Sequence, residues 1–252
     1  MIALEAVGIT VRFGGVTAVD DVSLSFESGE ICGIMGPNGA GKTTLFDVLS
    51  GVRRPTRGRV LLCGREVTTR SAVHRSRSGL RRTFQRQQTF GWLTVRDNLL
   101  VALESKGGGG GLGADMLRLP GRVRREHQRL QRVEEVLELC ALTDVAGASA
   151  STLDIGRARM VELARALVSE PTVLLLDEPT SGLQERETAQ LGATIERLRT
   201  EAGCAVILVE HDVGFMFEHC QRIAVLDLGR VLADGTPAKI RADEAVVAAY
   251  LG

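Results

Sequence analysis

The sequence has very little lysine, few aromatic residues and no excess of either charge. Only three of its 31 basic residues are lysines, and aromatic residues make up 4% of the 252 positions. Acidic residues also number 31, so the formal net charge is zero. No overall positive field favours a polyanion, and we therefore expect no nucleic-acid partner.

Paired cysteines, a secretory leader and long apolar runs are missing as well. The five cysteines are dispersed with no C-x-x-C pair, as Cys32, Cys63, Cys140, Cys204 and Cys220. This pattern predicts reduced, mostly buried thiols in a cytosolic protein. Residues 1–7 lack the basic segment and apolar core of a signal peptide. No apolar run approaches the ~20 residues that span a bilayer, so work at a membrane would require a peripheral subunit.

One of the rare lysines lies in a glycine-rich loop. The segment Gly36-Pro37-Asn38-Gly39-Ala40-Gly41-Lys42-Thr43 fits the phosphate-binding pattern G-x-x-x-x-G-K-[ST] at every fixed position. A compact ammonium can reach the β- and γ-phosphates of a nucleotide, whereas a planar guanidinium fits a tight loop poorly. The segment therefore predicts nucleoside triphosphate binding.

The flanking segments support this interpretation against a chance glycine-rich turn. Residues 30–35 form a short apolar run that predicts a buried strand, and residues 41–50 predict a helix that stops at Gly51. Strand, loop and helix together direct backbone N–H groups and a helix N-terminus toward the phosphates. The Thr43 hydroxyl is then placed to ligate Mg²⁺.

Later segments predict a parallel sheet and an inserted helical lobe. Residues 173–178, 205–211 and 223–227 are apolar strands, and the helices between them favour parallel crossovers. Helices are expected over 123–142 and 157–169. We expect a single domain of 252 residues, whose α/β core comprises about 1–86 and 166–252 and whose helical lobe comprises about 87–165.

Two segments before and within that lobe are expected at the surface. Residues 53–86 carry eleven arginines, which predicts a mostly solvated surface; contact with a partner or with anionic headgroups is the alternative. On this interpretation Arg75 and Arg77 lie in solvent. The glycine run 107–111 predicts a flexible surface loop.

Two acidic residues lie at the end of the strand predicted over residues 173–178. Asp177 and Glu178 lie at its carboxyl end, where open α/β sheets bind ligands, and a solvated strand end is the alternative. Asp177 is the candidate for the Mg²⁺ shell and Glu178 for polarising the attacking water. His211 ends the next strand in the same layer, where a γ-phosphate would lie.

The order of these motifs resembles the ATP-binding subunits of ATP-binding-cassette (ABC) transporters over essentially the whole chain, most of all the branched-chain amino acid importer ATPases. The matching segments are 12–15, 36–44, 82–85, 93–98, 162–167, 175–180 with 182–183, 209–212, 234–237 and 249–252. The resemblance implies a P-loop NTPase α/β core with a mixed or parallel sheet, an N-terminal antiparallel β portion and an inserted helical lobe.

The resemblance also implies roles for single residues. Phe13 would stack on adenine, and the loop from Gly36 through Thr43, with Thr44, would hold the phosphates. Thr43, Gln85 and Asp177 would hold Mg²⁺. Gln85 would report the γ-phosphate to the permease, and His211 would be the switch histidine.

Partners follow from the same resemblance. Two cassettes, identical or related, would close head to tail on two ATP molecules. They would serve transmembrane permease subunits from the cytoplasmic face of the cell membrane.

The sequence departs from the family signature. Leu-Ser-Gly-Gly-Gln, or Leu-Ser-Tyr-Gly-Gln, is replaced by Leu153-Asp154-Ile155-Gly156-Arg157. Asp154 would repel the partner's ATP, or it would turn back and cap the following helix. Arg157 could offset part of that repulsion, and Gly156 still permits a close backbone approach. In the later segment Ser181-Gly182-Leu183-Gln184, Gln184 replaces the Asp or Asn of relatives.

Three functions are therefore open. The first is an ATPase that energises an importer for branched-chain or related amino acids. The second is a cassette ATPase that acts on DNA, ribosomes or assembly factors, and the third is a nucleotide-gated subunit with a degenerate signature half-site. The single cassette, the helical lobe and the absence of a long coiled-coil segment favour transport.

Overall fold

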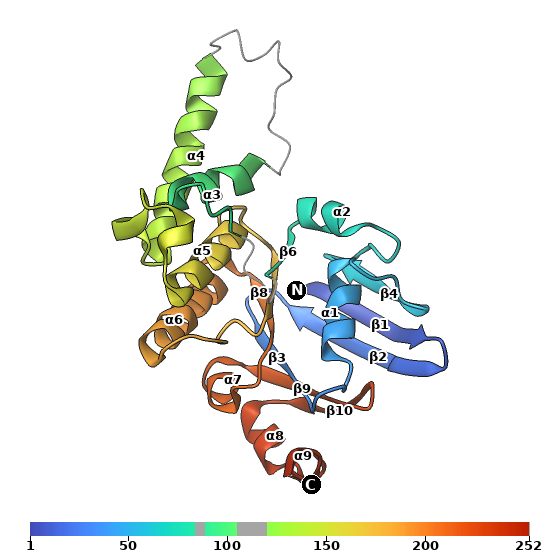
Figure 1. Cartoon of the computed structure of the whole chain (residues 1–252). Coiled ribbons are helices and arrows are strands. Elements are labelled where there is room, and N and C mark those ends of the chain that lie inside the picture. Colours follow the sequence, from blue (N-terminus) through green and yellow to red (C-terminus); the bar gives the residue numbers. More distant parts are fainter. Residues whose placement is uncertain (84–88, 105–119, 252) are drawn as a thin grey trace. The chain divides into compact units, whose positions relative to one another are not determined.

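The computed structural model describes residues 1–83, 89–104 and 120–251 (Figure 1). The chain divides into two compact units, which we call the sheet unit and the helical unit. The sheet unit comprises Met1–Gln85, Pro171–Ser181 and Ile195–Gly252, and the helical unit comprises Arg86–Glu170 and Gly182–Thr194. The predicted glycine loop at 107–111 and Gln85 lie outside the described residues.

The sheet unit begins with a four-stranded antiparallel sheet. Its spatial order is β2-β1-β4-β5, with bounds β1 (Ile2–Phe13), β2 (Val16–Glu27), β4 (Arg57–Leu62) and β5 (Arg65–Glu66). The second half of β2 alternates between buried and more exposed positions, as expected of a strand with one face on a core. The expected N-terminal antiparallel portion is confirmed.

A six-stranded sheet follows, in the order β10-β9-β3-β8-β7-β6. Its strands are β3 (Ile31–Met35), β6 (Leu80–Arg82), β7 (Val173–Asp177), β8 (Ala205–Val209), β9 (Arg222–Asp227) and β10 (Arg230–Gly235). All neighbours pair in parallel except β9 and β10. Every residue of β3, β7 and β8 is buried, which explains their continuous apolar sequences. The carboxyl ends of these three strands meet at one edge.

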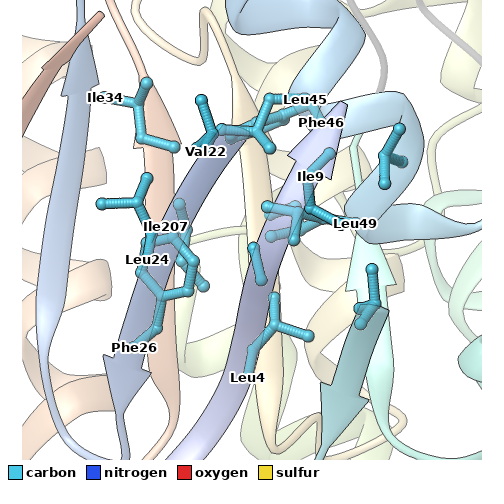
Figure 2. Close-up of a cluster of buried hydrophobic side chains, with 14 of the residues drawn as sticks. Leu4, Ile9, Val22, Leu24, Phe26, Ile34, Leu45, Phe46, Leu49 and Ile207 are labelled. Atoms are coloured by element: carbon cyan, nitrogen blue, oxygen red, sulfur yellow. The ribbon is translucent and has the colours of Figure 1, made fainter. Parts of the chain in front are cut away.

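Helices complete the sheet unit. They are α1 (Lys42–Ser50), α2 (Ala72–Arg77), α7 (Val213–His219), α8 (Pro237–Ala242) and α9 (Glu244–Leu251), and α6 (Glu185–Ala202) has residues in both units. Figure 2 shows Leu45, Phe46 and Leu49 of α1 in the core beside Leu4 and Ile9 of β1, and all five side chains are fully buried. Burying each such side chain stabilises the fold by about 1.5–3 kcal/mol, so α1 is firmly anchored.

Among the residues described, the helical unit has three further helices. They are α3 (Val95–Glu104), α4 (Pro120–Leu139) and α5 (Ile155–Leu167), with short 3₁₀ turns at Thr143–Val145 and Ala150–Thr152. α4 has an apolar face, on which Val133, Val136 and Leu137 are fully buried. Leu130, in the preceding turn of the same helix, is 39% exposed. α4 and α5 begin three and two residues earlier than expected, respectively.

The expected solvated arginine surface is wrong for Arg75, whose exposed fraction is 0%. Its guanidinium donates to the carbonyls of Val48 and Leu49 at 2.7 Å and to that of Thr68 at 3.0 Å. The last carbonyls of a helix lack a donor in the following turn; Arg75 donates to two of those of α1, and the Val48 carbonyl also accepts from the N–H of Gly51 at 3.2 Å. Seven other arginines of the stretch are exposed: Arg53, Arg54, Arg57, Arg59, Arg65, Arg70 and Arg77.

The cysteines behave as the composition predicts. Four of the five are buried and all are free thiols, while Cys63 is exposed. Burial raises the pKa of Cys204 and of Cys220 to about 12. These thiols are therefore protonated at neutral pH and serve as small apolar side chains.

Candidate active site

The phosphate loop joins β3 to α1 in a conformation that requires glycine at two positions. Gly36 has φ 151° and Gly41 has φ 99°. A Cβ on Gly36 would lie 2.2 Å from the carbonyl oxygen of Leu226, and one on Gly41 would lie 2.4 Å from that of Ala18. Because both obstacles are backbone atoms, no side chain can be accommodated, and the loop is held tightly against β9 and β2.

Lys42 is the first residue of α1 and is 7% exposed. Its ammonium donates to the carbonyl of Gly36 at 2.5 Å and to that of Pro37 at 3.0 Å. Burial lowers the pKa of Lys42, and the charges of Glu178 and Asp177 act in the opposite direction. The ammonium is therefore held over the loop, where the charges of Asp177 at the end of β7 and of Glu178 directly after it act on it.

A cavity of about 200 Å³ lies over this loop. Residues 38–44 line it together with Glu178, Val209 and His211. The Nε2 atom of His211 lies 3.2 Å from Oε1 of Glu178. The structure thus brings three sequence-predicted features, the loop, Glu178 and His211, to one opening.

Glu210 supports this arrangement through hydrogen bonds to the backbone, and the sequence analysis predicted no role for it. Its side chain is buried, and its two carboxylate oxygens accept from the backbone N–H groups of Thr180 at 2.6 Å and of His211 at 3.0 Å. It therefore ties the loop after β7 to the end of β8. The feature of the sequence that could have indicated Glu210 is its position next to His211 at the end of a strand.

Asp177 is 3% exposed and is paired with Arg82. One guanidinium nitrogen of Arg82 lies 2.9 Å from Oδ2 of Asp177, and another lies 2.6 Å from Oδ1 of Asp47. Burial raises the pKa of Asp177, whereas the hydrogen bond and charge of Arg82 lower it. Arg82 was also missed, because it stood in an arginine stretch expected to lie mostly in solvent.

The remaining oxygen of Asp177 fits a metal ion. Its Oδ1 atom is buried and has no hydrogen-bond partner among the described residues. Thr43 lines the cavity one residue after Lys42. Over the described ranges, no group of three or more His, Cys, Asp or Glu side chains could hold a metal alone. Mg²⁺ typically takes one or two carboxylates together with substrate phosphates, so this sparse donor set suits Mg²⁺ with a nucleotide.

Phe13 ends β1 and is 43% exposed. The guanidinium carbon of Arg53 lies 4.4 Å from the centre of its ring, a cation–π arrangement. Phe13 does not line the cavity over the phosphate loop.

The signature segment lies in the helical unit, where Asp154 caps α5. Its Oδ1 accepts from the N–H of Arg157 at 2.7 Å, so the carboxylate turns back as one sequence alternative proposed. The guanidinium of Arg157 lies 2.8 Å from Asp144. A Cβ on Gly156 would fall 1.8 Å from Oε1 of Glu187, so the Glu187 carboxylate covers this glycine. Two carboxylates therefore surround the N-terminus of α5.

Comparison with known families agrees with these motifs. The family model described as ABC transporter matches residues 19–181. The chain belongs to the ABC transporter family. A second model, described as branched-chain amino acid ATP-binding cassette transporter, matches residues 230–252. By family the chain is an ABC-type ATPase with a nucleotide-binding domain.

Curated ABC relatives match nearly end to end. The chain is 40% identical over 249 residues to the high-affinity branched-chain amino acid transport ATP-binding protein BraF of Pseudomonas aeruginosa, covering 99% of this chain and 97% of BraF. It is 39% identical over 249 residues to LivG of Escherichia coli K12, which has the same description and is covered to 97%.

Solved structures agree on the fold. A nucleotide-free ATP-binding cassette from an ABC transporter superposes with a TM-score of 0.85 at 27% identity, covering 100% of both chains. An ATP-binding cassette of an ABC transporter in its ADP conformation gives the same TM-score and identity over 100% of this chain and 99% of the other. The P-loop α/β fold expected from the ABC resemblance is confirmed. Within the part of the chain described, no helix has the length and apolar character to cross a membrane.

Proposed function

We propose that this chain binds ATP with Mg²⁺ over the phosphate loop and hydrolyses it to energise import of branched-chain or related amino acids. The observation that supports hydrolysis is the single cavity shared by the phosphate loop, Glu178 and His211. The proposed identity of the cargo is inferred from the similarity of the chain to BraF and LivG over nearly their full lengths, and the names of both state branched-chain amino acid transport.

In this proposal the loop from Gly36 through Thr43, with Thr44, cradles the phosphates. When ATP binds, the Lys42 ammonium gives up its hydrogen bonds to two backbone carbonyls and donates to the β- and γ-phosphates instead. The phosphates are stronger acceptors because they are charged. Phe13 stacks on adenine, with the Arg53 guanidinium already on its ring. Thr43, Gln85 and Asp177 would hold Mg²⁺, which neutralises phosphate charge when bound.

Glu178 polarises the attacking water, and His211 keeps that carboxylate in place. The 3.2 Å contact between Nε2 of His211 and Oε1 of Glu178 fixes the carboxylate beside the phosphate loop. The buried Glu210 fixes His211 in turn, through the His211 N–H. A general base held this way is placed to accept a proton from a water in the cavity over the phosphate loop.

Partners and architecture belong to the same proposal. Residues from about 1–86 and 166–252 form the ATP-binding core, and residues from about 87–165 form the helical lobe. A second cassette, identical or related, offers its phosphate loop to Asp154, Gly156 and Arg157 of this chain. Gln85 reports nucleotide state to transmembrane permease subunits at the cytoplasmic face of the cell membrane.

The test is reconstitution of the chain with its permeases and partner cassette in proteoliposomes. We expect ATP-dependent uptake of radiolabelled leucine, isoleucine or valine, and loss of both uptake and hydrolysis in Glu178→Gln. Hydrolysis with no uptake of these amino acids overturns the cargo. A complex that binds no ATP overturns the proposed function altogether.

A second candidate has a specific observation in its favour. Asp154 and Glu187 place carboxylates around the N-terminus of α5, where a signature segment would meet the partner's γ-phosphate. A subunit of this kind would hydrolyse ATP at its own phosphate loop. Its signature segment would serve mainly the nucleotide-gated closure of the two cassettes. Single-turnover kinetics of the assembled complex separates the two sites: equal turnover at both excludes this candidate.

A further inference from the structure

Arg82 connects three elements of the sheet unit at the point where β6 ends. The backbone continues β6 beside β7, with Arg82 opposite Leu175. The side chain is 7% exposed and reaches Asp177 at the end of β7 and Asp47 in the middle of α1. It also donates to the Ser50 hydroxyl at 3.1 Å. A single guanidinium therefore links the strand that carries the acidic pair to the helix that follows the phosphate loop.

The two carboxylate oxygens of Asp177 have different surroundings. Oδ2 is 2.9 Å from the Arg82 guanidinium, whereas the buried Oδ1 has no partner among the described residues. A buried carboxylate without a counter-charge is costly, because burial disfavours the ionised form. The pair with Arg82 offsets that cost at one oxygen and fixes the plane of the carboxylate. The other oxygen remains available as a ligand.

The fork of Arg82 contacts two carboxylates through different nitrogens, Asp177 through one and Asp47 through the other. A lysine could not do the same, since one ammonium cannot present two separate donors of a planar fork to two carboxylates.

We propose that Arg82 is a positioning residue for the metal of Mg²⁺–ATP: it holds Oδ2 of Asp177 so that Oδ1 faces the ion. This inference rests on the proposed function of the site. Residues that orient metal ligands typically contribute about 10- to 100-fold to metal affinity when they are removed. Arg82 should therefore act on the metal-dependent part of nucleotide binding and leave the metal-free part unchanged.

The experiment measures the affinity for a non-hydrolysable ATP analogue by calorimetry, once with Mg²⁺ and once with EDTA. The ratio of the two affinities is the contribution of the metal. In Arg82→Gln we expect this ratio to fall about 10-fold or more, with the affinity in EDTA equal to that of the unsubstituted chain. Arg82→Lys keeps the charge and should lower the ratio in the same direction.

The matched control is Asp47→Asn, which breaks the other half of the same cluster without touching Asp177. We expect the unsubstituted ratio in this variant. The inference is overturned if Arg82→Gln and Arg82→Lys keep that ratio, if Asp47→Asn lowers it equally, or if Arg82→Gln loses affinity in EDTA. Should Arg82→Gln fail to fold, Arg82→Lys decides the matter. An unsubstituted chain that shows no gain from Mg²⁺ instead contradicts the proposed function.

Discussion

Glu178 has a backbone conformation that few residues other than glycine adopt, with φ 49°. Strain of this kind is held in place by its surroundings and is common at active sites. Here the Glu178 N–H donates to the carbonyl of Val209, and the side chain contacts His211. The residue is thus held at both its backbone and its carboxylate, as the proposed role of orienting one water requires.

We predict that Glu178→Gln abolishes turnover while retaining ATP binding. The amide keeps the shape of the side chain but cannot accept a proton, and general bases contribute about 10²- to 10⁴-fold. Steady-state ATPase rates of the assembled complex, compared with ATP affinity from calorimetry, check this. An unchanged rate would remove Glu178 from the mechanism.

Lys42→Ala should weaken nucleotide binding itself. Hydrogen bonds to charged groups contribute about 1.5–3 kcal/mol, so the dissociation constant for ATP should rise roughly 10-fold or more. Lys239→Ala is the matched control, because Lys239 is an exposed lysine in α8. Calorimetric titration with ATP distinguishes them, and equal affinities for both variants would contradict the assignment.

At the scale of the elements, α2 supplies the side chain that hydrogen-bonds to the last carbonyls of α1. Arg75 donates to two of the last carbonyls of α1 from a fully buried position, while Arg77 in the same helix is exposed. Burial lowers the pKa of Arg75 to about 10, so the guanidinium remains charged at neutral pH. The N-terminus of α1 carries Lys42, and the opposite end of the same helix is thereby fixed.

Arg75→Met should lower the free energy of unfolding by about 3 kcal/mol, because the carbonyls of Leu49 and Thr68 lose the guanidinium donor and that of Val48 keeps only the N–H of Gly51. Arg77→Met should stay within about 0.5 kcal/mol, as exposed substitutions usually do. Urea denaturation of both variants measures the difference. Equal midpoints would show that Arg75 contributes no more to stability than an exposed arginine.

Local patterns predicted the strands and helices that form the site, and long-range contacts explain what they missed. Strand β3, the loop and α1 follow from apolar runs and glycine positions, which act over a few residues. Arg75 and Arg82 could not be distinguished from their exposed neighbours, since the α1 carbonyls that Arg75 meets and the carboxylates that Arg82 meets lie 26 or more residues away in sequence. Glu210 was hidden for the same reason: it accepts from Thr180, 30 residues earlier.

At the scale of the whole molecule, the proposed pairing with another cassette would make this chain part of two composite sites. Its phosphate loop and Glu178 would serve one site, and its signature segment would serve the other. The second segment is acidic: Asp154 caps α5, and Glu187 covers Gly156 while accepting from the N–H of Gln184 at 2.8 Å. A partner with an intact signature would therefore make the two sites unequal.

Asp154→Ser tests that asymmetry. Serine keeps a cap on α5, so the helix is retained while a negative charge near the partner's γ-phosphate is removed. The Asp154 side chain is 63% exposed and one oxygen accepts from Arg157 N–H, so solvent screens much of the repulsion. We expect a gain of about 1 kcal/mol, or roughly fivefold in ATPase rate or in ATP-driven dimer affinity.

Asp144→Asn is the control for this last prediction. Asp144 is 61% exposed and pairs with the same Arg157, but it does not cap α5. Loss of any nearby negative charge would raise activity in both variants, whereas a specific opposition to the γ-phosphate raises it only in Asp154→Ser. Analytical ultracentrifugation with ATP and ATPase assays of the heteromeric complex give the two readouts. If Asp154→Ser changes neither, the carboxylate serves only as a helix cap and the two composite sites are electrostatically equivalent at this position.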